Sequence, residues 1–254
     1  MKKPNHFLTL RDRTPEELRA VIDLALKLKD ERKAGKSHCD ILKGKSLAMI
    51  FEKSSTRTRM SFETAMNELG GYPMFLSSRD IQLGRGEPIK DTARVISRYA
   101  HCVMMRTFAH ERVEEFAGFA DIPVINALTD SYHPCQVMAD MMTMLECFGK
   151  IAGLKVAYIG DGNNMANSWI NAAAQMGFDL SVASPAEYAV DKKIYESVKE
   201  TADKKGAVIT VTEDPKEAVK NADVVYTDVW ASMGQEDESK KRIVDFQGFQ
   251  VDKA

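Results

Sequence analysis

The chain has 254 residues, of which 44% are hydrophobic, and this length lies near the size at which one hydrophobic core usually divides into two domains. Its 35 basic and 37 acidic residues give a formal net charge of −2, so no long-range field of one sign would draw it to nucleic acid or to a membrane surface. We therefore expect a small-molecule partner, and binding to neither nucleic acid nor membrane.

The cysteines are isolated from one another in the sequence. Cys39, Cys102, Cys135 and Cys147 share no C-x-x-C spacing and have no histidine at ligand spacing, which argues against a zinc site and a disulfide framework. The first residues, MKKPNHFLTLRD, lack the apolar core of a signal peptide, and no apolar run reaches the roughly 18 residues of a membrane span. We therefore expect a cytoplasmic protein with reduced thiols and no bound metal.

The first half of the chain alternates between helix and strand patterns. Residues 14–30 begin with Thr14 as a helix N-cap and Glu17 at capping-box spacing, followed by apolar residues at helical intervals. The apolar run SLAMIF (46–51) predicts a strand, and the next helical pattern stops at Gly70 and Gly71. The remaining predicted elements are a helix at 91–100, a strand at 102–106, a helix at 111–120 and a strand at 123–128. This alternation predicts a parallel α/β sheet.

The second half repeats the alternation after a helix predicted over 137–148. Strands are predicted at 155–160, 179–184, 208–212 and 223–229, with helices at 164–175 and 187–204. The polar run GQEDESKKR (234–242) is interpreted as a surface loop. We predict an α/β fold with two domains, each an open parallel sheet flanked by helices. The predicted boundaries are 1–135 for the first domain, 136–149 for an interdomain helix and 150–254 for the second domain.

The segment SSTRTR (54–59) concentrates hydrogen-bond donors between a strand and a helix. In open parallel sheets ligands bind at the carboxyl ends of the strands, and the amides that begin a helix favour an anion. The hydroxyls of Ser55, Thr56 and Thr58 and the guanidinium of Arg57 would add donors for phosphate oxygens. The alternative is that Ser54 is an ordinary N-cap and that Arg57 and Arg59 are solvated; Lys53 fits either interpretation.

Two further strand ends of the same predicted sheet carry polar residues. Arg106 ends the strand CVMMR, and His133 and Gln136 lie in the loop after PVINAL. A histidine beside a carbonyl can polarise it, and an arginine can bridge carbonyl and phosphate oxygens, which suits acyl transfer from a phosphate-activated donor. Taken alone, His133 is equally compatible with a structural role.

Three segments in this order resemble the signatures of the ornithine carbamoyltransferases: STRTR (55–59), HPCQ (133–136) and DVWASMG (228–234). The resemblance runs over nearly the whole chain. It implies that Ser55, Thr56, Arg57, Thr58 and Arg106 hold the phosphate of carbamoyl phosphate, and that Thr58, Arg106, His133 and Gln136 surround its carbamoyl oxygen. The implied reaction is attack of the neutral δ-amine of L-ornithine on the carbamoyl carbon, giving L-citrulline and phosphate without metal or cofactor.

The resemblance also assigns the amino-acid substrate to the second half of the chain. It places Asn164 on the ornithine carboxylate, and Asp228, Ser232 and Met233 at the α-amino end. Arg106, His133 and Asp228 are thus the expected catalytic residues. Without the resemblance, Asn163 and Asn164 could be ordinary turn residues and SMG an ordinary flexible loop. The loop 79–87, RDIQLGRGE, resembles the segment that family members extend into a neighbouring subunit, which implies a homotrimer in which Gln82 reaches the phosphate.

Two observations oppose a simple assignment. GDGNN (160–164) follows a strand and resembles the start of a dinucleotide site, but Met165 stands where the third glycine would be, so we expect no nicotinamide chemistry. The chain also stops at Ala254, before the His-Cys-Leu-Pro segment of the family, so we expect an incomplete second domain. The alternatives are therefore a non-catalytic subunit that binds carbamoyl phosphate, or a carbamoyltransferase for another amine such as putrescine.

Overall fold

The structure is a computed structural model that describes residues 4–231 and 236–252. Contacts between Cα atoms divide the chain into two compact units. Unit 1 comprises Met1–Asp12 and Asp23–Cys135, and unit 2 comprises Arg13–Ile22 and Gln136–Ala254. Each unit contains its own parallel four-stranded sheet, as the alternating pattern of the sequence predicts.

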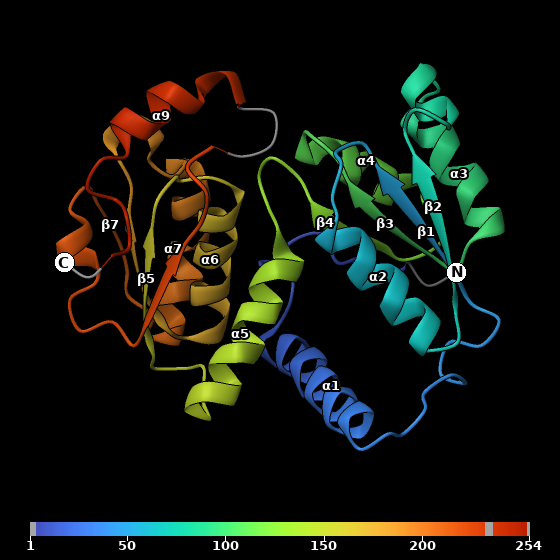
Figure 1. Ribbon diagram of the computed structural model, residues 1–254, viewed down its shortest axis with the longest axis horizontal. Helices are drawn as coiled ribbons and strands as arrows, with labels where there is room; N and C mark the ends of the chain where they lie inside the picture. Colours follow the sequence, from blue (N-terminus) through green and yellow to red (C-terminus); the bar gives the residue numbers. More distant parts are fainter. Residues whose placement is uncertain (1–3, 232–235, 253–254) are drawn as a thin grey trace. The chain divides into compact units, whose positions relative to one another are not determined.

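The sheet of unit 1 has the strand order β2-β1-β3-β4 (Figure 1). Its strands are β1 (Ser46–Phe51), β2 (Tyr72–Ser77), β3 (Cys102–Arg106) and β4 (Val124–Leu128), and all pairs are parallel. The chain moves from β1 to β2 on one side and then returns to place β3 on the other side of β1. The switch point of the topology therefore lies between β1 and β3, where open α/β sheets bind their ligands.

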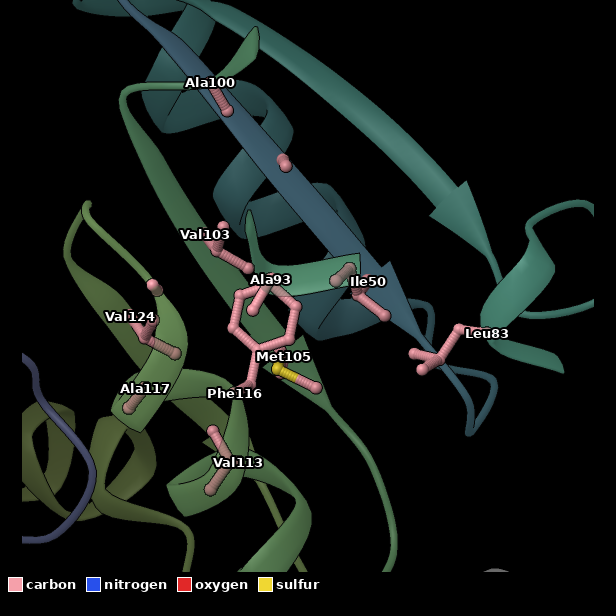
Figure 2. Close-up of a cluster of buried hydrophobic side chains, with 12 residues drawn as sticks. Ile50, Leu83, Ala93, Ala100, Val103, Met105, Val113, Phe116, Ala117 and Val124 are labelled. Atoms are coloured by element: carbon pink, nitrogen blue, oxygen red, sulfur yellow. The ribbon is translucent and has the colours of Figure 1, made fainter. Parts of the chain in front are cut away.

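Helices cover both faces of this sheet because strand side chains alternate between the faces. Leu47, Met49 and Phe51 pack with Met66 of α2 (Arg57–Glu68), whereas Ala48 and Ile50 face α3 (Ile89–Tyr99) and α4 (His110–Phe119). Figure 2 shows this second core, in which the Phe116 ring lies among Ala93, Ile50 and Met105. Full burial of such side chains is the main stabilising contribution to the unit.

The first helix, α1 (Pro15–Lys33), starts with the predicted capping box. The Thr14 amide donates to Glu17 Oε2 at 3.0 Å, and the Glu17 amide donates to Thr14 Oγ1 at 3.2 Å. These reciprocal bonds satisfy two of the amides that a helix start leaves without intrahelical partners. Leu18 and Ile22 are the buried residues of this helix.

The sheet of unit 2 has the order β7-β6-β5-β8. Its strands are β5 (Lys155–Ile159), β6 (Asp179–Ala183), β7 (Ile209–Thr212) and β8 (Val224–Thr227). The chain runs from β5 through β6 to β7 and then returns to pair β8 with β5. A second switch point therefore lies between β5 and β8.

Unit 2 also contains the longer helices α5 (Pro134–Phe148), α6 (Asn164–Met176) and α7 (Lys192–Lys205), and the short helices α8 (Pro215–Ala218) and α9 (Ser239–Asp245). Phe246 and Phe249, which follow α9, pack with Ala157, Ile159 and Ala183 of the sheet. Trp169 of α6 contacts Tyr226 of β8, with 5.3 Å between ring centroids. Single turns of 3₁₀ helix complete the chain: η1 (Gln82–Arg85), η2 (Ala186–Tyr188) and η3 (Glu236–Glu238).

Strand β2 and helix α9 differ most from the sequence interpretation, and the short helix α8 was not predicted either. Strand β2 was not predicted; it is an edge strand, with Tyr72 and Phe75 exposed and Pro73 in its second position, so it lacks the pattern of a buried strand. Residues 236–245, which include most of the predicted surface loop at 234–242, form η3 and α9 instead. Within residues 4–231 and 236–252, none of the helices has the length and apolar character that a membrane crossing needs.

Candidate active site

The loop after β1 delivers the hydroxyl-rich segment to the switch point of unit 1. Helix α2 begins at Arg57 with Thr56 as its N-cap, so Ser54 is not the cap. The Thr58 amide donates to Ser55 Oγ at 3.2 Å, and the first turn of α2 contains no acidic side chain. This helix start therefore presents amides, hydroxyls and an arginine without a competing carboxylate, which is the environment that an anion prefers.

Arg106 ends β3 beside this helix start. Its side chain lies on the α2 face of the sheet, and its Nη1 donates to Thr58 Oγ1 at 3.3 Å. The residue is only 6% exposed, yet its Nε has no hydrogen-bond partner among the described residues. Burial lowers the pKa of Arg106, and the charge of Arg57 lowers it further. The buried guanidinium of Arg106, with an unused donor and near the charge of the exposed Arg57, favours an anionic ligand.

His133 follows β4, the next strand of the sheet. Burial lowers the pKa of His133 to about 4, and the positive charge of Arg106 contributes to the shift. The imidazole is therefore neutral at neutral pH and can donate one N–H to a carbonyl oxygen. The ends of β1, β3 and β4 thus bring Thr58, Arg106 and His133 together, as the order of strands in the sequence predicts.

Three other candidates are placed less centrally. Gln136 is exposed in the first turn of α5, and its Nε2 donates to Asp140 Oδ1 at 3.0 Å. Gln82 is exposed in η1 and its side chain makes no hydrogen bond to another described residue. Arg59 lies over the Phe75 ring at 3.7 Å from its centroid and pairs with Glu63 at 3.0 Å. Arg59 therefore fits the surface interpretation, whereas the charge of Arg57 acts on Arg106.

In unit 2 the loop after β5 carries the asparagines. Asn163 is the N-cap of α6: its Oδ1 accepts from the Met165 amide at 2.9 Å and from the Tyr158 hydroxyl at 3.2 Å. Its side-chain oxygen is therefore used within the fold. Asn164, the first residue of α6, is half-buried and is the asparagine that the resemblance assigns to substrate.

Carboxylates gather around the second switch point. Asp228 follows β8, and its Oδ1 accepts from the Val229 amide at 2.8 Å. Burial raises the pKa of Asp140 to about 6, and the negative charge of Asp228 adds to this shift. Burial and the charge of Asp228 also raise the pKa of Tyr158. This negative environment suits a cationic amine. The predicted Ser232 and Met233 lie outside the described residues.

Comparison with protein families separates the same two halves of the chain. Residues 5–146 match the carbamoyl-P binding domain of aspartate/ornithine carbamoyltransferase, and residues 152–254 match the Asp/Orn binding domain. The chain belongs to the aspartate/ornithine carbamoyltransferase family. Ser55, Arg106 and His133 fall in the first of these family domains, and Asn164 and Asp228 fall in the second.

Individual members of the carbamoyltransferase family resemble the chain over most of its length. The ornithine carbamoyltransferase of Wolinella succinogenes is 57% identical over 98% of this chain and 80% of its own, and that of Geobacter sulfurreducens is 55% identical over 98% and 81%. The solved structure of ornithine carbamoyltransferase from Pyrococcus furiosus superposes with a TM-score of 0.93 at 49% identity, covering 97% of this chain and 79% of that one.

Sequence reasoning missed a buried polar contact in unit 2 of this carbamoyltransferase chain. Asp161, in the loop after β5, accepts from Arg242 Nη1 of α9 at 2.6 Å, and both residues are buried, at 8% and 6% exposed. The same Nη1 donates to the Trp230 carbonyl at 2.9 Å. Arg242 stands in a run of charged residues that is typical of a loop, so only the tertiary fold identifies it.

Packing explains the presence of Gly162, one of the glycines that suggested a dinucleotide site. A Cβ at Gly162 would lie 2.4 Å from the Val190 amide nitrogen and 2.6 Å from the Tyr188 carbonyl oxygen. The Gly162 amide donates to that carbonyl at 2.8 Å. The glycine therefore permits two segments of backbone to approach each other, and no cofactor is needed to account for it.

Proposed function

We propose that this chain transfers the carbamoyl group of carbamoyl phosphate to the δ-amine of L-ornithine, giving L-citrulline and phosphate. The observation that carries the proposal is the buried Arg106 at the switch point of unit 1. Its Nη1 donates to Thr58, its Nε is unused, and its pKa is lowered by the charge of Arg57. Membership of the carbamoyltransferase family and the names of its relatives support the choice of substrates.

The proposed chemistry needs donors where negative charge develops. The amine nitrogen attacks the carbamoyl carbon, the carbon–oxygen bond to phosphate breaks, and the proton lost by the amine leaves with the phosphate. Arg106 and neutral His133 donate to the carbamoyl oxygen, which carries negative charge in the tetrahedral intermediate. Ser55, Thr56, Arg57 and Thr58 hold the phosphate, and Gln136 contributes its amide to the carbamoyl group.

The second substrate is assigned by charge. Ornithine has two amino groups and one carboxylate, so Asp228 would pair with the α-ammonium group and the Asn164 amide would bind the carboxylate. Ser232 and the Met233 backbone would complete the α-amino end. Because a free alkyl ammonium has a pKa of about 10.4, the site must favour loss of a proton from the δ-amine, and the cationic groups of unit 1 act in that direction.

The cellular setting is part of the proposal. Production of citrulline places the reaction in arginine biosynthesis, in the cytoplasm. The assembly is a homotrimer in which Gln82 of one chain reaches the phosphate bound to its neighbour. The domain boundaries at 135 and 150, with α5 as the connecting helix, complete the proposed organisation.

Calorimetry with carbamoyl phosphate tests the donor site. Arg57→Ala should abolish measurable binding, because the phosphate loses a charged fork. Arg98→Ala is the matched control, since Arg98 makes an exposed ion pair with Asp121 at 3.3 Å, away from the carboxyl ends of the strands. Equal affinity of wild type and Arg57→Ala would overturn the proposal.

A colorimetric citrulline assay tests the transfer itself. Wild type should form citrulline from carbamoyl phosphate and ornithine, and ornithine should outcompete putrescine, which has no carboxylate for Asn164. Carbamoyl phosphate binding without citrulline formation would instead identify a non-catalytic subunit. A preference for putrescine would keep the reaction and change the substrate.

A further inference from the structure

A partly buried ion pair lies beside the phosphate-binding segment and takes no part in the proposed chemistry. Glu52 directly follows β1, and the alternation along that strand directs its side chain to the face of α4, opposite to Arg106. There it meets Arg112 of α4. The Glu52 side chain is 9% exposed and that of Arg112 is 33% exposed.

The carboxylate of Glu52 is held on both oxygens. Arg112 Nη2 donates to Oε1 at 2.6 Å, and Arg112 Nε donates to Oε2 at 3.1 Å, which is the bidentate geometry of a strong pair. Oε2 also accepts from Thr107 Oγ1. The Glu52 backbone amide donates to the Arg106 carbonyl at 2.9 Å. Glu52 is thus bonded to Arg106 and to its neighbour Thr107.

These bonds lie where the sheet is least regular. Met105 pairs with Asn126 but Arg106 pairs with Leu128, so β4 has one extra residue, Ala127, directly beside the arginine. The Thr107 amide still donates to the Leu128 carbonyl at 3.0 Å. On the β1 side, Arg106 pairs with Phe51, and the Glu52 amide continues this ladder by donating to the Arg106 carbonyl.

Stability does not account for this pair by itself. Removing two ionised groups from water costs about as much as their attraction returns, so a well-packed apolar pair would stabilise the fold equally well. What the ion pair adds is geometry, because three donors fix one carboxylate. Glu52 stands three residues before Ser55, so the same carboxylate also sets where the phosphate-binding segment begins.

We infer that Glu52 and Arg112 are positioning residues for carbamoyl phosphate: their bidentate pair, with Thr107, aligns the end of β3 with the loop after β1, so that Arg106 and Thr58 face one ligand. The inference rests on the proposed function. Neither residue touches the substrate. Their effect is exerted through the backbone of Arg106 and through the loop that carries Ser55.

The test measures carbamoyl phosphate affinity by calorimetry and the KM for ornithine by citrulline formation. Arg112→Met should weaken carbamoyl phosphate binding about tenfold to a hundredfold, the scale expected when a reacting group is misplaced by about 1 Å. The KM for ornithine at saturating carbamoyl phosphate should stay within about twofold, because unit 2 is untouched. Arg112→Lys, which keeps the charge but loses the fork, should recover part of the affinity.

Two further variants separate positioning from folding. Val113→Ala removes a fully buried side chain from the adjacent position of α4 and lowers the stability of the same unit without touching the ion pair. It should lower the unfolding midpoint and leave carbamoyl phosphate affinity unchanged. The double variant Glu52→Gln with Arg112→Met should be no weaker than Arg112→Met, because both changes break one unit.

The outcomes distinguish this inference from the proposed function. If wild type binds carbamoyl phosphate and Arg112→Met binds it with equal affinity, the positioning role is overturned and the proposed function stands. The positioning role is also overturned if Val113→Ala loses as much carbamoyl phosphate affinity as Arg112→Met when the two variants lose the same stability. Absence of binding in wild type would overturn the proposed function, and the inference with it.

Discussion

His133 shows how one buried side chain is prepared for its task. Its pKa is lowered to about 4 by burial and by the charge of Arg106, so the neutral imidazole predominates throughout the physiological range. A neutral donor can stabilise a developing oxyanion without first losing a proton to solvent. Burial and the charge of Arg106 thus disfavour the protonated imidazole and keep His133 in the neutral form that can polarise a carbonyl.

The same shift makes a prediction about stability. The folded state binds this proton more weakly than the unfolded state, whose histidine has a pKa of about 6.5. The contribution of His133 is therefore fully present above pH 6.5 and is lost as the pH falls toward 4, by about 2–3 kcal/mol. His133→Asn should lack this part of the pH dependence.

Urea unfolding of both proteins at pH 7.5 and pH 4.5 provides the measurement. The difference between the two pH values should be smaller in His133→Asn than in wild type. His38→Asn is a control on another histidine, which pairs with Glu31 at 2.7 Å. Identical pH dependence in wild type and His133→Asn would contradict the assigned shift.

At the scale of single elements, the strands that carry the first site were predictable and β2 was not. β1, β3 and β4 are short apolar runs because helices cover both of their faces, and such runs are visible in a sequence. β2 has no fully buried side chain, and Tyr72 and Phe75 are exposed, so no comparable apolar run marks it. Without β2 the switch point cannot be located, although the residues beside it can be named.

Helix α9 escaped prediction for a different reason. Its sequence, SKKRIVD, has more charge than apolar periodicity, and its one buried residue, Arg242, pairs with Asp161 in the loop after β5. The cation compensates Asp161, whose pKa is raised by burial and lowered again by this pair. A buried arginine in a charged run cannot be told from a solvated one until its partner is known.

Arg242→Met should therefore be costly. It leaves Asp161 buried without its cation and releases the Trp230 carbonyl, with an expected loss of about 3–5 kcal/mol in the free energy of unfolding. The loss should be larger at pH 8 than at pH 5, because protonation relieves an unpaired carboxylate. Urea unfolding of both proteins at the two pH values measures it.

Lys241→Met is the matched control for this change. Lys241 precedes Arg242 in α9 and pairs with Glu187 at 2.9 Å, but its side chain is exposed. Its loss should change stability far less than the loss of Arg242, because exposed ion pairs contribute little to folding. Similar effects of the two substitutions would show that the burial of Arg242 has no energetic consequence.

Gly162 offers a second test at the element scale. Gly162→Ala would push a methyl group into the backbone of residues 188–190, and backbone cannot yield as a side chain can, so we expect a loss of about 2–3 kcal/mol. Gly118, in α4, has open space where a methyl group would lie and an ordinary helical φ. Gly118→Ala should raise stability by about 0.5–1 kcal/mol. Thermal unfolding should shift in opposite directions for the two variants.

For the whole molecule, both candidate sites follow from one topological rule. In each unit the chain reverses its direction across the sheet once, between β1 and β3 and between β5 and β8. The segments that follow these strands carry the donors for an anion in unit 1 and the acceptors for a cation in unit 2. STRTR, Arg106, GDGNN and Asp228 stand at these four strand ends, and HPCQ follows β4. The resemblance to the carbamoyltransferases, added to this placement, is what predicted a substrate for each half.

The proposed homotrimer makes the last prediction. If Gln82 acts in the site of a neighbouring chain, each site takes Arg57 from one chain and Gln82 from another. Arg57→Ala and Gln82→Ala chains should then each be impaired, while trimers assembled from both contain some sites with neither substitution. For random mixing around a cyclic trimer, about a quarter of the sites are intact. Mixing after mild dissociation should therefore recover about a quarter of wild-type citrulline formation.

Size-exclusion chromatography with light scattering should give a mass near three times 28.4 kDa for every sample. If Gln82 instead serves its own chain, mixing creates no new combination within any site, and activity should remain the average of the two variants.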